Sequence, residues 1–200
     1  MPLKKYLAEC LGTFALTLAV SLSILGSFPV ATPVIAALTL GLFVYSLGHV
    51  SGTHINPAVT IGLWSIKKIE TRDAFFYVIA QTVGAFVSLA LIATVFAKGS
   101  VHGLPVGDTI TVGIAELMGT FFFAFGIASV VYGKVPAAFS GLMVGGSLLL
   151  GIAVAALLGS NGVLNPAVAF GIESFGTMYI LGPIIGSVLG MQTYKFLASE

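Results

Sequence analysis

The chain has 200 residues, of which 58% are hydrophobic and only 8% are charged, and its net charge is +1. Soluble globular domains carry about 25% charged residues, so this composition excludes a water-soluble domain and indicates a protein embedded in lipid. The sequence shows no basic cluster beyond short flanking groups, no metal-ligand cluster, no activated nucleophile and no phosphate-binding loop. We therefore expect no nucleic-acid partner, no cofactor or metal ion, and no enzymatic activity.

Six apolar stretches are long enough to cross a bilayer, since roughly 20 apolar residues span its hydrocarbon core. In chain order they cover about residues 6–26, 34–50, 74–97, 113–132, 136–158 and 177–198. The 25 glycines fit helices that pack closely in lipid. The sequence thus predicts an all-α membrane protein with six transmembrane helices and both termini on one side.

Lysine and arginine are unevenly distributed about these six crossings. The side that carries the termini and the loops around 67–73 and 133–135 holds Lys4, Lys5, Lys67, Lys68, Arg72, Lys134 and Lys195. The opposite side holds Lys98 alone. Positive residues favour the cytoplasmic side, so we predict a multi-pass protein of the cell membrane with cytoplasmic N- and C-termini.

The second half of the chain repeats the first. Residues 8–14 (AECLGTF) match 115–121 (AELMGTF), and residues 81–85 (QTVGA) echo 183–187 (PIIGS). One tripeptide also occurs twice, as Asn56, Pro57 and Ala58 and as Asn165, Pro166 and Ala167. Because each repeat has three spans, the second enters the membrane from the opposite face, and the halves form inverted repeats. Repeat one covers about 1–98 and repeat two about 108–200.

Each tripeptide predicts the start of a short helix, because proline suits the first helical turn. The apolar runs that follow, about 58–65 and 167–172, are too short to cross. The stretches before them, 48–55 and 159–164, are rich in glycine and small residues and predict unwound chain. We therefore expect two re-entrant half-helices whose N-termini meet near the bilayer midplane, with the two asparagines as caps.

Glu9 and Glu116 occupy equivalent positions in the first span of each repeat. A carboxylate inside the membrane marks a functional site by default. We favour a structural brace, which accepts hydrogen bonds from loop N–H groups, over a proton relay, because both copies would hold equivalent loops. His49 and His54 precede the first tripeptide, and we expect them to be buried and hydrogen-bonded rather than to form a pH gate.

Two half-helix N-termini at the midplane create a positive potential that opposes cations. The two asparagine amides offer N–H donors, and the unwound segments offer acceptors along a path that we expect His54, Ile55, Val163 and Leu164 to line. A water molecule at the asparagines would point its hydrogens away from them on both sides. That orientation breaks the hydrogen-bonded chain that proton hopping needs.

These features together resemble the aquaporin and glycerol-facilitator family of major intrinsic proteins. The similar segments cover residues 8–13, 54–60, 80–85 and 182–186, and the resemblance extends over essentially the whole chain. It implies a single channel domain of six tilted helices and two half-helices, with one pore per subunit and a homotetrameric assembly. The implied partners are other copies of the chain, membrane lipid and small neutral solutes.

The chain departs from the family at the outer constriction, where the family usually has arginine after the second tripeptide and this sequence has Val168. Helix counting places Ala36, Ala153 and Gly162 beside it, or Ile152 in place of Ala153 if the register shifts by one. This apolar set makes it an atypical member. We expect a passive channel for water, with glycerol, urea and ammonia as further candidates; a secondary transporter and a structural protein with a vestigial pore stay open as alternatives.

Overall fold

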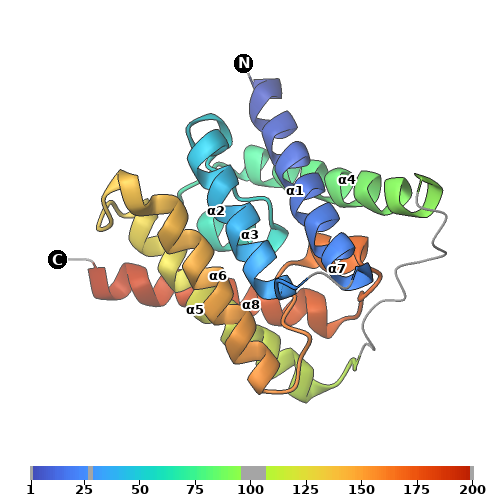
Figure 1. Cartoon of the computed structure of the whole chain (residues 1–200). Helices are drawn as coiled ribbons and strands as arrows, with labels where there is room; N and C mark the ends of the chain where they lie inside the picture. Colours follow the sequence, from blue (N-terminus) through green and yellow to red (C-terminus); the bar gives the residue numbers. More distant parts are fainter. Residues whose placement is uncertain (1, 27–28, 96–106, 199–200) are drawn as a thin grey trace.

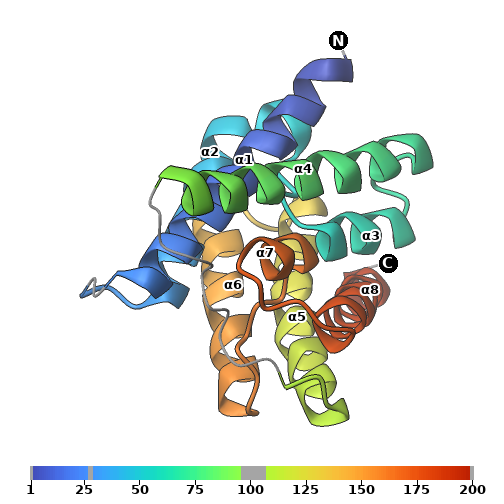
Figure 2. The same ribbon diagram turned by 90° about the vertical axis from the view of Figure 1, so that its right-hand side faces the viewer.

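A computed structural model describes residues 2–26, 29–95 and 107–198, and all regular elements in these ranges are helical (Figures 1 and 2). The long helices are α1 (Pro2–Leu25), α2 (Thr32–Ser51), α4 (Thr71–Val95), α5 (Ile110–Val131), α6 (Ser140–Leu157) and α8 (Met178–Ala198). The short helices are α3 (Pro57–Ser65) and α7 (Pro166–Gly171), and a 3-10 turn, η1 (Ala137–Phe139), precedes α6. The predicted fold class is thereby confirmed for the described residues.

Five of the described helices, α1, α2, α4, α5 and α6, are long and apolar enough to cross a membrane. The sixth long helix, α8, has 21 residues and packs along α5. Five predicted spans agree with these helices to within a few residues at each end. The third was predicted to end at residue 97, which lies outside the described residues, as do Lys98 and the predicted end of repeat one.

The prediction of unwound chain from residue 48 was wrong, because α2 continues to Ser51. Gly52 then ends the helix with a φ of 84°, and its N–H donates to the carbonyl of Gly48. A single left-handed glycine after the last turn is a common helix stop. The unwound segment before the first tripeptide therefore covers only residues 52–55.

The two repeats pack in the same way. A Cβ atom on Gly84 of α4 would lie 2.2 Å from the carbonyl oxygen of Cys10 on α1. A Cβ atom on Gly186 of α8 would lie 2.2 Å from the carbonyl oxygen of Leu117 on α5. These glycines and their partners are equivalent in the internal repeat, so the first and third long helices of each repeat meet through the same close contact.

The half-helices link the two repeats. The short helix α3 packs against α8, and α7 packs against α4, so each half-helix contacts the third long helix of the other repeat (Figure 2). The contacts are close: a Cβ atom on Gly62 of α3 would lie 2.3 Å from Ser187 Oγ, and one on Gly171 of α7 would lie 3.1 Å from the carbonyl oxygen of Ala85. This exchange brings the N-termini of α3 and α7 together in the middle of the bundle.

Candidate pore

Asn56 and Asn165 cap the two half-helices. Asn56 Oδ1 accepts a hydrogen bond of 2.8 Å from the N–H of Ala58, and Asn165 Oδ1 accepts one of 3.1 Å from the N–H of Ala167. Both asparagines have extended backbones, as N-cap residues do. Asn56 thus satisfies one N–H group of the first helical turn, and Asn165 satisfies two, because the N–H of Val168 also donates to its Oδ1 at 3.3 Å.

The same two side chains join the half-helices to each other. Asn56 Nδ2 donates to the carbonyl of Leu164 at 2.9 Å, and Asn165 Nδ2 donates to the carbonyl of Ile55 at 3.0 Å. An asparagine amide carries two N–H donors, and these bonds use one donor of each residue. Since both asparagines line a cavity, each has a second donor to offer to a solute there.

Glu9 of α1 holds the unwound segment before α3. Its carboxylate is fully buried and accepts hydrogen bonds from the N–H of His54 at 2.9 Å and from the N–H of Ile55 at 2.6 Å. The hydroxyl of Ser51 and the amide of Gln81 also donate to it. The carboxylate thus supplies acceptors for a segment that has no helical hydrogen bonds of its own.

Glu116 of α5 does the same for the segment before α7. The carboxylate accepts from the N–H of Val163 at 3.0 Å and from the N–H of Leu164 at 2.7 Å. The hydroxyl of Ser160 donates to it as well. The two glutamates therefore make equivalent contacts in the two repeats, including one with a serine hydroxyl.

His54 has a side-chain network that the sequence did not predict. Its Nδ1 atom lies 3.1 Å from the hydroxyl of Thr60, which also accepts from Gln81 Nε2 at 2.9 Å. His49, by contrast, is exposed on α2, so the expectation that both histidines are buried holds only for His54. A polar glutamine and threonine inside apolar helices were the available sequence signal for this network.

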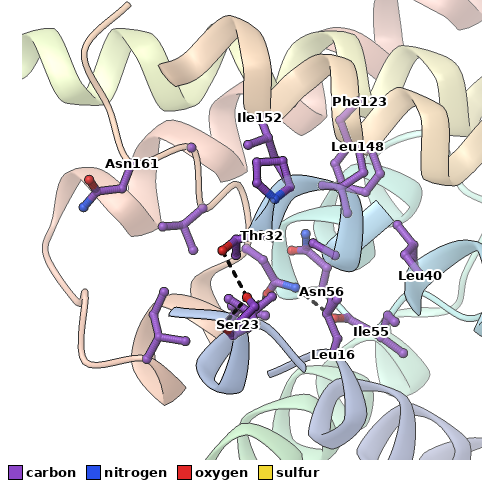
Figure 3. A pocket seen from close by; sticks show the side chains of 18 of the residues that line it. Leu16, Ser23, Thr32, Leu40, Ile55, Asn56, Phe123, Leu148, Ile152 and Asn161 are labelled. Carbon is purple, nitrogen blue, oxygen red and sulfur yellow. Dashed lines mark hydrogen bonds between the residues drawn. The ribbon is translucent and has the colours of Figure 1, made fainter. Parts of the chain in front are cut away.

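Two cavities extend into the bundle from opposite ends. The first, of about 380 Å³, extends from the end of α1 and the start of α2 to Asn56 and Asn165. The second, of about 450 Å³, lies where α4 begins and α5 ends. Leu40, His54 and Phe123 line both cavities, so the two meet at these residues. Figure 3 shows the first cavity, from Asn161 at one end to Leu40 and Phe123 at the other.

Most of the predicted constriction residues line the first cavity. Ala36, Gly162 and Val168 do so, but Ala153 is exposed on α6 and Ile152 takes its place. The position counted for Ala153 was therefore wrong by one residue. A shift of one residue turns a helix by about 100°, which moves a side chain from the lumen to the outer surface.

Three of the four predicted pore-loop residues line a cavity, and the fourth does not. His54, Ile55 and Val163 line the first cavity, whereas Leu164 is fully buried and is not among the residues that line either cavity. Cβ atoms on Gly119 and Gly151 would each lie 2.9 Å from a methyl carbon of Leu164, so its side chain packs between α5 and α6. The contribution of Leu164 to the asparagine pair is its carbonyl, which accepts from Asn56.

The two cavities differ in charge. The lining of the first is uncharged, while the second is lined by Lys68, Glu70 and Asp73. Asp73 forms an ion pair with Lys5, and Tyr6 donates to it at 2.8 Å. Within the described residues there is no group of three or more histidine, cysteine, aspartate or glutamate side chains that could hold a metal ion.

The fold and this lumen define the class of the protein: a membrane channel built from two inverted repeats, with a cavity that reaches the two joined half-helix N-termini. A model of the major intrinsic protein family matches residues 1–194. The chain therefore belongs to the major intrinsic protein family.

Several named relatives are similar to it. Aquaporin AqpM from Methanothermobacter marburgensis is 37% identical over 180 residues, which cover 78% of this chain and 72% of the relative. Aquaporin Z from Rhodopseudomonas palustris is 31% identical, with 100% of this chain and 95% of the relative covered. An X-ray structure of the aquaglyceroporin from Plasmodium falciparum has a TM-score of 0.68 at 21% identity, over 98% of this chain and 95% of that chain, which supports the fold.

Proposed function

We propose that the chain is a passive channel for water and other small neutral solutes, with a pore that runs through both cavities. The observation that carries this proposal is the asparagine pair. Asn56 and Asn165 lie where two opposed half-helices meet, and each has one N–H donor left for a solute in the cavity. Donors fixed at one point of an otherwise apolar lumen suit a neutral solute that accepts hydrogen bonds.

The same arrangement supports proton exclusion at Asn56, Pro57 and Ala58 and at Asn165, Pro166 and Ala167. The N-terminus of each half-helix carries about half a positive charge, and both point at the same place. A water oxygen drawn to the two amides turns its hydrogens outward on either side, which interrupts a proton-conducting chain of waters.

The outer constriction in this proposal consists of Ala36, Ile152, Gly162 and Val168. All four are uncharged, and all line the first cavity. Without an arginine there, exclusion of cations and protons rests on the asparagine pair. The first cavity also has room for solutes larger than water, which supports glycerol, urea and ammonia as additional candidates.

Glu9 and Glu116 act as braces in this scheme. Glu9 accepts four hydrogen bonds and Glu116 accepts three, so their oxygens are occupied by the loops they hold. Neither glutamate lines a cavity. This favours a channel over a secondary transporter, whose coupling requires a titratable or ion-binding group along the path.

The proposed topology places the second cavity in the cytoplasm together with both termini. Lys5 and Lys68 lie at this end, and the ammonium of Lys68 is 4.5 Å from the ring centre of Tyr132 at the end of α5. A lysine-rich end favours the cytoplasmic side. We further propose one channel domain, with repeats of about 1–98 and 108–200, that assembles as a homotetramer.

Flux through purified protein in liposomes tests the proposed function. Stopped-flow light scattering with water, glycerol, urea and ammonia gradients is compared with protein-free liposomes. We expect water permeability well above the lipid background and no dependence on a proton or sodium gradient. Permeability equal to that of protein-free liposomes would favour a vestigial pore, and gradient-dependent saturable transport would favour a transporter.

A further inference from the structure

The first cavity does not end at the level of Val168. The first cavity is continuous from the end of α1, past Ala36 and Val168, to the asparagine pair. Leu40, His54 and Phe123 are the residues that line both this cavity and the second one. These three residues lie where the two cavities meet, and we call them the waist.

Side-chain size distinguishes the waist from the outer constriction. The outer constriction contains an alanine, a glycine, a valine and an isoleucine, whereas the waist contains a phenylalanine from α5 and a leucine from α2, so the largest apolar side chain of the two sets is Phe123. Phe123 and Leu40 are each only 2% exposed, so both are packed in place. A Cβ atom on Gly151 of α6 would lie 3.2 Å from Phe123 Cβ, which shows how closely α6 lies behind this residue.

The waist has two chemically different walls. Phe123 and Leu40 form an apolar wall, while His54 belongs to the polar network with Thr60 and adjoins Asn56. An apolar wall replaces none of the hydration that a polar solute loses in a narrow passage. A solute with a carbon skeleton must therefore fit between the ring of Phe123 and the polar wall.

We infer that Phe123, together with Leu40, sets the size limit of the pore. This inference rests on the proposed channel function. Three-carbon polyols such as glycerol then enter the first cavity and pass more slowly than water, because Phe123 limits their passage beyond the asparagine pair. In this inference the residues of the outer constriction do not decide the size limit.

Graded truncation of Phe123 tests the inference. Phe123→Leu and Phe123→Val are reconstituted beside the wild type, and the ratio of glycerol to water permeability is measured by light scattering. We expect this ratio to rise by about tenfold, because one methylene in an apolar pocket already changes discrimination by that factor and Phe123→Leu removes three side-chain carbon atoms. Phe122→Leu is the matched control, because Phe122 is 39% exposed on the same helix and lines neither cavity, and we expect no change from it.

The outcomes separate the inference from the proposed function. Wild-type water permeability at the lipid background would refute the channel itself. A normal wild-type channel in which Ile152→Ala raises the glycerol ratio more than Phe123→Leu does would overturn only the inference and place the limit at the outer constriction. If the Phe123 variants do not assemble, Leu40→Val tests the same wall from α2, and an unchanged ratio there would also overturn it.

Discussion

The two loops that enter the membrane share their backbone support and differ in their side chains. Glu9 and Glu116 hold equivalent backbone N–H groups in the two repeats. Around the first loop, His54, Thr60 and Gln81 form a polar network. At the corresponding positions of the second repeat the sequence has Val163, Ala169 and Pro183.

This comparison separates what the fold requires from what the pore uses. An unwound segment inside a membrane needs acceptors for its N–H groups whatever the channel conducts, so both repeats retain a glutamate. The polar network occurs beside the first tripeptide alone, and its histidine is one of the three residues at the waist. We therefore assign the network to the proposed solute path and not to the architecture that the two repeats share.

The largest effect is expected from the residues that the two loops share. Glu9→Gln and Glu116→Gln each replace an acceptor-only carboxylate with an amide whose NH₂ faces N–H donors. A buried N–H group left without an acceptor costs about 1–3 kcal/mol, so both variants lower stability substantially. The measurement is the thermal unfolding midpoint in detergent, followed by circular dichroism.

Glu173→Gln is the control for these variants, since Glu173 is exposed in the segment after α7. If either buried variant unfolds at the wild-type temperature, that loop does not depend on its glutamate. A loss in one repeat only would show that the two loops are not equivalent in their support.

A smaller effect is expected from the network found in one repeat. Thr60→Val removes the hydroxyl that contacts His54 Nδ1 and Gln81 Nε2, and it costs about 1 kcal/mol for the lost bonds. Because the ring of His54 then loses its contact with the hydroxyl, we expect water permeability to change while the protein still assembles. Thr82→Val is the control, since Thr82 is exposed and bonds only within α4. Unaltered water permeability in Thr60→Val would show that the network does not affect the pore.

The smallest effect on the unfolding midpoint is expected from the polar contacts that join the first and third long helices of each repeat. Repeat one uses the ion pair of Lys5 and Asp73, and repeat two uses Asp108, which accepts from the N–H groups of Met178 at 2.7 Å and Thr177 at 3.1 Å. The Met178 N–H, with that of Thr177, holds the pKa of Asp108 below its usual value. Asp108 therefore stabilises the fold above the unfolded pKa, and this contribution is lost as the pH falls through the folded value.

We accordingly expect Asp108→Asn to lower the unfolding midpoint slightly at pH 7. The difference from the wild type should shrink as the pH falls below the ordinary aspartate value of 3.8. Unfolding midpoints measured across this pH range provide the check, with Glu173→Gln as a surface-charge control. A difference that grows on acidification would contradict the assigned role of the carboxylate.

Much of this architecture could be predicted because the governing signals are local or repeated. The lengths of the apolar stretches predicted the long helices, and the proline that follows each asparagine predicted where α3 and α7 begin. The matched segments at 8–14 and 115–121 gave the inverted repeat. Each of these signals depends on residue type and order, which the sequence contains in full.

The remaining details depend on rotation and packing. Ala153 and Ile152 differ by one step on a helix, and counting from a distant tripeptide does not fix which one faces the lumen. Leu164 was expected at the pore surface, but a close approach of Gly119 and Gly151 takes up its side chain. Phe123 is one of three consecutive phenylalanines, and only the tertiary structure distinguishes it from its exposed neighbour Phe122.

The most direct test of the account compares water and proton flux through the same proteoliposomes. Osmotic water permeability is measured by stopped-flow light scattering, and proton flux is measured with a trapped pH-sensitive dye. If water passes the joined asparagines in a broken hydrogen-bonded chain, water permeability exceeds that of protein-free vesicles while proton flux equals theirs. Water permeability at the lipid background, or a proton flux that rises together with water, would contradict the account.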